Sequence, residues 1–107
     1  MSEADPAEPT ETELVHLPDL DGDGRGVLFE GAPKTVRLAL EEGDHVPAHR
    51  HPDTAIVCYV IEGRLDVTLG DETVELVAGD AARFSGDQDI SPAAQEDSVA
   101  LLVLAEG

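Results

Sequence analysis

Apolar residues along this chain alternate with polar ones in short runs, and glycine-rich or acidic turns separate these runs. In one run Val36, Leu38 and Leu40 fall on a single face, and residues 65–69 alternate in the same way. A period of two residues is typical of strands that bury one face. Sustained helical spacing is missing from the sequence, so we expect an all-β fold.

Many short strands between evenly spaced turns predict a small antiparallel β-barrel or sandwich. The last run is mostly apolar, as in a strand that is buried on both faces. Residues 85–95 are polar and are predicted to form a loop. The expected strands cover residues 13–17, 27–30, 34–41, 55–61, 65–69, 73–77, 81–84 and 97–105.

The chain has 107 residues, which is enough for one domain with a single core. Residues 1–12 are rich in acids and prolines and have no large apolar side chain after Met1. Such a segment cannot offset its ordering entropy by burial. We therefore expect a disordered acidic tail over residues 1–12 and one barrel domain over residues 13–107.

The acidic run DLDGDGRGVLFE, residues 19–30, matches the spacing of a calcium-binding loop. Acids occupy its first, third, fifth and twelfth positions, and a glycine occupies the sixth. However, Pro18 and Pro33 oppose the helices that normally flank such a loop. Gly26 also stands where an apolar residue is usual. We expect a turn that leads into the strand at 27–30.

Acidic residues outnumber Lys and Arg by 24 to 6, which gives a formal net charge of −18. Lys34 is the only lysine, and this composition resembles the proteins of halophilic archaea; an ordinary acidic protein is the alternative. Phosphate binding needs clusters of Lys and Arg, so nucleic-acid binding is not expected. One cysteine and the lack of a signal peptide or membrane span predict a soluble, cytoplasmic protein.

The richest chemistry lies in residues 43–63, GDHVPAHRHPDTAIVCYVIEG. His49 and His51 are two residues apart, so in extended backbone their imidazoles share a face. Two imidazoles that reach one point are a typical beginning of a metal site. Pro47 and Pro52 bracket the pair and place it at the entrance to the strand at 55–61.

Residues 43–63 resemble the first motif of the cupin superfamily, with Gly43, the His49-Arg50-His51 triplet and a YVIEG sequence that ends at Gly63. Gly79 and the aspartate after it resemble the start of the second motif. The resemblance implies a six- to eight-stranded jelly-roll barrel, commonly a homodimer. In metal-binding cupins, two histidines and a glutamate from the first motif and one histidine from the second hold the metal.

This chain departs from that pattern at two of the four ligand positions. The glutamate position falls on Ile56, and the second-motif histidine position falls on Ile90. Isoleucine has no donor atom, whereas tight protein metal sites supply three or four ligands. The resemblance thus implies a weak site at His49 and His51 that takes Fe, Mn, Ni or Zn at low occupancy, or a vestigial one.

Three further residues are candidates for completing the site. Cys58 shares strand parity with Ile56 and provides either a thiolate ligand or a small buried hydrophobe. His45 shares parity with the histidine pair, but four strand residues span about 13 Å. Asp89 is adjacent to Ile90, and a slip of one residue would present its carboxylate instead.

Two classes of function remain open from the sequence. The first is a sensory or accessory protein that binds a small molecule in a pocket formed by Ile56, Cys58, Val60 and Ile90. The second is a metal-dependent dioxygenase, isomerase or lyase that acts on a small molecule through His49 and His51. The pattern reveals no nucleophile–base pair, and the fold alone does not decide between the two.

Overall fold

The computed structural model describes residues 12–20, 22 and 24–106. Within this part of the chain, one short 3₁₀ turn precedes eight strands, and the all-β prediction is confirmed. The elements are η1 (Leu17–Asp19), β1 (Gly24–Phe29), β2 (Lys34–Leu40), β3 (Thr54–Glu62), β4 (Arg64–Leu69), β5 (Glu72–Val77), β6 (Ala81–Ser85), β7 (Ile90–Ala94) and β8 (Ser98–Glu106). No helix in the described part of the chain is long and apolar enough to cross a membrane.

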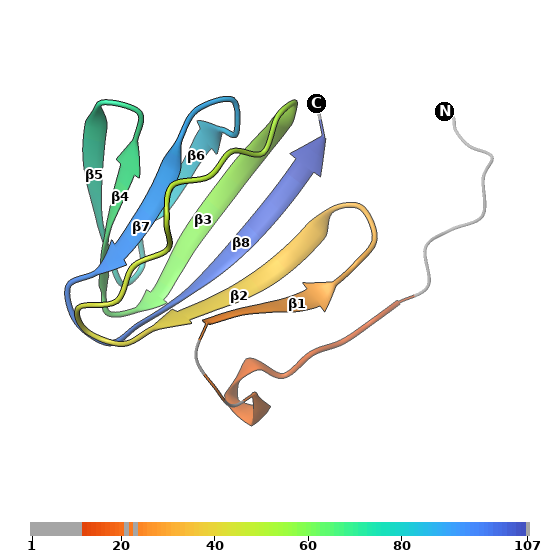
Figure 1. Ribbon diagram of the computed structural model, residues 1–107. Coiled ribbons are helices and arrows are strands. Elements are labelled where there is room, and N and C mark those ends of the chain that lie inside the picture. The colour runs from red at the N-terminus through yellow and green to blue at the C-terminus, as the bar shows by residue number, and fades with distance from the viewer. Residues whose placement is uncertain (1–11, 21, 23, 107) are drawn as a thin grey trace.

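The strands form two antiparallel sheets that face each other (Figure 1). One has the order β1-β2-β8-β3-β6, and the other has the order β5-β4-β7. The connection between β2 and β3, residues 41–53, runs along the free edge of β7 and exchanges backbone hydrogen bonds with it. This connection therefore borders the space between the sheets and carries His45, His49 and His51.

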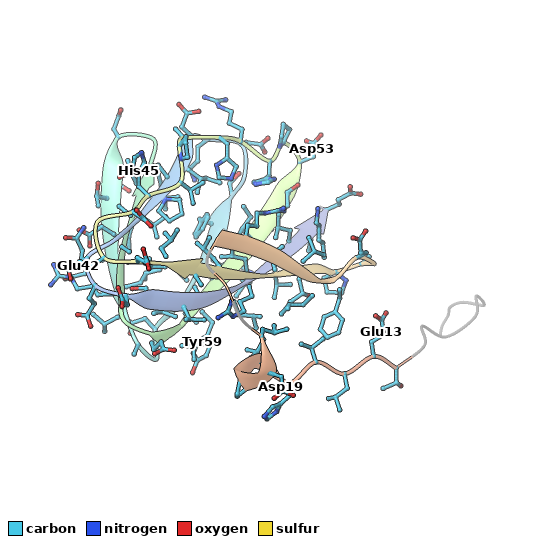
Figure 2. The ribbon with its side chains drawn as sticks, turned by 60° about the horizontal axis from the view of Figure 1, so that its bottom comes forward. Glu13, Asp19, Glu42, His45, Asp53 and Tyr59 are labelled. Carbon is cyan, nitrogen blue, oxygen red and sulfur yellow. The ribbon has the colours of Figure 1, made fainter. Side chains whose placement is uncertain are left out.

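Alternation along β3 explains how the core is built. Ile56, Cys58 and Val60 are buried, whereas the residues between them are exposed. Tyr59, for example, lies on the side of its sheet that faces away from the other sheet (Figure 2). β4 contributes Leu65 and Val67 from the opposite sheet. The core is thus an aliphatic layer between two walls, as a chain with few aromatic residues requires.

The structure corrects the sequence analysis in three places. Residues 13–17 form no strand, and the chain turns at η1 instead. β7 lies within residues 85–95, which were predicted to form a loop. β8 is only partly buried over most of its length, so it does not have two buried faces.

Two other predictions include residues that the structure does not describe. The acidic tail lies outside the described residues except for Thr12. Asp21 and Asp23 of the calcium-like run also lie outside them. The described end of that run enters β1, and no α-helix flanks it in the described chain.

Candidate functional site

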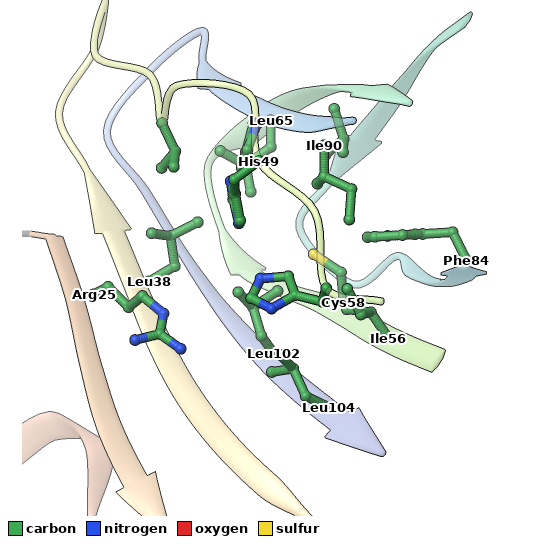
Figure 3. A pocket seen from close by; sticks show the side chains of 14 residues that line it. Arg25, Leu38, His49, Ile56, Cys58, Leu65, Phe84, Ile90, Leu102 and Leu104 are labelled. Atoms are coloured by element: carbon green, nitrogen blue, oxygen red, sulfur yellow. The ribbon is translucent and has the colours of Figure 1, made fainter. Parts of the chain in front are cut away.

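A cavity of ≈ 80 Å³ lies between the two sheets. Its walls are largely apolar side chains from both sheets, and Figure 3 shows how they converge on one space. The polar side chains that reach it are Arg25, His49, His51 and Cys58. Its apolar walls include Leu38, Ile56, Phe84, Ile90, Leu102 and Leu104.

Backbone hydrogen bonds and a hydrogen bond from its ring hold His49 at the mouth of this cavity. Its backbone N–H donates to the carbonyl of Ile90 at 3.1 Å, and the Ile90 N–H donates back at 2.9 Å. The ring Nδ1 lies 3.0 Å from the carbonyl oxygen of Pro47. A carbonyl only accepts, so Nδ1 carries the proton and the lone pair of the neutral ring is on Nε2.

His51 lies beside His49, with ring centroids 4.8 Å apart and planes at 85°. Burial lowers the pKa of His51, and the nearby His49, Arg25 and Lys34 lower it further. His51 therefore favours the neutral imidazole near pH 7. The predicted convergence of the pair is present, although His49 and His51 lie in an irregular connection and only His49 makes an isolated β-bridge.

Gly86 fixes the position of His51. The His51 N–H donates to the Gly86 carbonyl at 2.9 Å. A Cβ at Gly86 would collide with the carbonyl oxygen and Cβ of His51. The approach is therefore too close for any residue with a side chain.

The structure brings most of the predicted pocket residues together. Ile56 and Ile90 both line the cavity, and Ile90 lies directly opposite His49. Cys58 lines it as well, and burial raises the pKa of its thiol to about 11, so the sulfur is a protonated thiol at neutral pH. Val60 does not line the cavity and belongs to the core, which corrects its predicted place in the pocket.

The other candidate ligands point elsewhere. His45 is exposed, pairs with Ala93 through its backbone and does not line the cavity (Figure 2). The carboxylate of Asp89 accepts a hydrogen bond from Arg50 Nε at 2.9 Å. Among the described residues, no three His, Cys, Asp or Glu side chains are grouped closely enough to hold a metal ion. Two imidazoles do not fit a tightly held metal, which needs three or four protein ligands.

Sequence reasoning missed two cationic residues near the cavity. Arg25 lines it, and Lys34 is close enough to affect the pKa of His51. Neither belongs to the motif that contains the histidines, because both come to the site through pairing in the sheet. Arg25 lies opposite Leu38, and Lys34 lies opposite Leu104. A predicted register for β1, β2 and β8 would have been needed to find them.

Comparison with known proteins agrees with this architecture. A conserved protein with a double-stranded β-helix domain from Klebsiella pneumoniae has a TM-score of 0.78 and 23% identity, over 91% of this chain and 92% of its own. A Thermus thermophilus protein has a TM-score of 0.77 and 22% identity, over 89% and 98% of the two chains. KdgF from Halomonas sp. has a TM-score of 0.68 and 22% identity, over 78% and 77%.

At these identities the structural neighbours show the fold alone, and they support the predicted jelly-roll type. No curated protein matches the chain in sequence. Residues 36–105 match the cupin domain family, Cupin_2. This range includes the histidine pair, Ile56 and Ile90, but not Arg25 or Lys34. Because the match spans more than half of the sequence, the chain belongs to the cupin family.

Proposed function

We propose that this chain binds a small molecule in the cavity between its sheets and acts as a sensory or accessory cupin. The observation that carries the proposal is the lining of the cavity, with apolar walls and polar groups mainly at the mouth. Ligand sites commonly combine apolar walls with a few placed polar groups. Ile56 and Ile90 stand where the cupin pattern has metal ligands, so they favour an apolar guest at that point.

In this proposal the histidine pair forms hydrogen bonds and binds Fe, Mn, Ni or Zn at most weakly. Such a site has two protein ligands and is completed by water, so a chelator strips it readily. Protein purified without added metal is expected to contain less than one metal ion per chain.

The alternative function is a metal-dependent dioxygenase, isomerase or lyase that acts on a small molecule. One observation favours it: the Pro47 carbonyl fixes Nδ1 of His49 and leaves Nε2 available. Metal-bound imidazoles commonly have their second nitrogen held in this way. Chelator-resistant metal in a one-to-one ratio would favour the enzyme over the binding protein.

Binding in the cavity is tested with isobutanol, a neutral probe with a short branched apolar body. Side-chain methyl resonances of the protein report its binding. We expect saturable shifts at Ile56, Ile90 and Leu102, which line the cavity. The variant Cys58→Leu adds bulk to the wall and should abolish these shifts. Val57→Leu adds a methylene on the exposed face of the same strand and should leave them unchanged. Equal shifts in both variants would contradict binding inside the barrel.

A further inference from the structure

We infer that the guest is a small carboxylate with a short branched apolar body, and that Arg25 and Lys34 hold its negative charge at the cavity mouth, beside the histidine pair. The inference rests on the proposed function, since it names the chemical class that the same cavity would take. It is carried by the sheet register, by the distribution of charge and by the size of the cavity.

The register places Arg25 on the inner face of its sheet. Residues that lie directly opposite each other on neighbouring strands point to the same face. Arg25 pairs with Leu38, which is buried and lines the cavity. Because β1 is an edge strand of the sheet, its inward side chains lie at the rim. Figure 3 shows Arg25 directed towards the cavity on the same side as Leu38.

The same argument places Lys34 beside it. Lys34 lies opposite Leu104 of β8, and Leu104 lies opposite Ile56 of β3. Leu104 and Ile56 both line the cavity, so Lys34 shares their face of the sheet. Arg25 and Lys34 also both act on His51 electrostatically, which places their charges near its ring. Arg25 and the two imidazoles therefore line one opening, and Lys34 lies on the same face of the sheet, opposite a residue that lines the cavity.

Such a cluster is unexpected in this chain, because the net charge is −18 and Lys and Arg number only six. Two of the other cations are neutralised, since Arg50 pairs with Asp89 and Arg64 pairs with Glu75. Neither Arg25 nor Lys34 takes part in an ion pair with another residue that the structure describes. A cationic guest would meet like charge here, whereas an anion would meet complementary charge.

The guest's size and shape follow from the cavity. Its volume of ≈ 80 Å³ is about half of the ~150 Å³ apolar cavity that accommodates benzene. An interior of that size suits a tail of about three carbons. A guanidinium at the mouth offers two parallel N–H donors, which match the two oxygens of a carboxylate. A short branched carboxylate satisfies both ends of the site.

The test titrates the full chain with isobutyrate and with isobutyramide, its neutral isostere, at constant ionic strength and pH. Chemical shifts of the cavity methyl groups report binding of each probe. Isobutyrate is expected to bind about tenfold more tightly than the amide, because the loss of a hydrogen bond to a charged group weakens binding by at least that factor. Equal affinities would overturn the inference and leave binding in the cavity standing. Failure of both probes to bind would overturn the inference and the proposed function together.

Three variants test whether residues at the cavity mouth cause the difference in affinity between isobutyrate and isobutyramide. Arg25→Gln should weaken isobutyrate about tenfold and leave isobutyramide unchanged. Arg25→Lys keeps the charge but loses the paired donors, so it should recover only part of the affinity that Arg25→Gln loses. Arg83→Gln is the matched control, because it makes the same change in net charge on the exposed side of β6. Equal losses in Arg25→Gln and Arg83→Gln would show an effect of overall charge and overturn the inference.

Discussion

Replacement of Ile56 by Glu tests whether this position faces the histidine pair. Ile56 is only 4% exposed and lies between Phe84 and Leu104 on the neighbouring strands. It lines the same cavity as both imidazoles. A glutamate there would place an oxygen donor where the cupin pattern has one, inside an otherwise apolar wall.

Without metal, this substitution should destabilise the protein substantially. Loss of the buried isoleucine removes about 2 kcal/mol of apolar burial. Burial of an unsatisfied carboxyl group adds a penalty of about 1–3 kcal/mol. The expected loss is therefore about 3–5 kcal/mol, out of the ~5–15 kcal/mol that stabilises a typical domain. The Ile56→Glu variant should unfold at clearly lower urea concentration in the presence of EDTA.

With metal, part of that loss should return, because a carboxylate and two imidazoles provide three ligands. Zn²⁺ or Mn²⁺ at about 100 times its dissociation constant stabilises the folded state by about 2.7 kcal/mol. Urea denaturation with EDTA and with added metal measures both states. The double variant with His49→Gln is the control, and it should lose this metal-dependent gain while keeping the destabilisation.

Two results would refute the reasoning. If metal stabilised the Ile56→Glu variant no more than the wild type, position 56 would not face the histidine pair. If the wild type contained stoichiometric metal that resists a chelator, a third ligand would already be present. The judgement that two imidazoles hold metal only weakly would then be wrong.

The other predictions concern charge, packing and titration. The melting temperature should rise from low to molar KCl as the charge of −18 is screened, and a flat response would contradict the resemblance to halophilic proteins. Gly86→Ala should cost about 1–3 kcal/mol in urea denaturation, because the added Cβ displaces His51. Burial raises the pKa of Cys58 to about 11, so a disulfide reagent at about pH 8 should label the folded protein far more slowly than the unfolded chain. Burial and neighbouring cations lower the pKa of His51 below its ordinary 6.5, so the unfolded chain takes up this proton first as pH falls. Stability should therefore decrease below pH 6.5 until the lowered pKa is passed, and His51→Gln should flatten that part of the pH–stability curve.

Much of the fold was predictable because β3 and β4 alternate cleanly, with one face towards the core. The same signal failed at residues 13–17, where apolar residues recur but no neighbouring strand pairs with them. Leu14 is 93% exposed there. β7 was missed because it follows a polar loop and contains Pro92. Proline is tolerated there because β7 is an edge strand of its sheet, paired regularly only with β4.

The candidate site was also predictable only in part. The two-residue spacing of His49 and His51 was enough to predict that they converge, even though the local backbone is not a strand. Ile56 and Ile90 were located by counting along the cupin motifs, and both line the cavity. Arg25 could not be located by counting, since its position depends on the pairing of β1 with β2.

The edge position of β1 places Arg25, the residue proposed to select the guest's charge, outside the core that stabilises the barrel. β1 pairs with β2 alone, lies outside the matched domain and contributes the exposed Arg25. Substitution of an exposed residue usually changes stability by only about 0.5 kcal/mol, whereas a wall residue such as Ile56 costs several times more. In the proposed site, position 25 can therefore change, and with it the charge of the guest, without a compensating mutation in the interior.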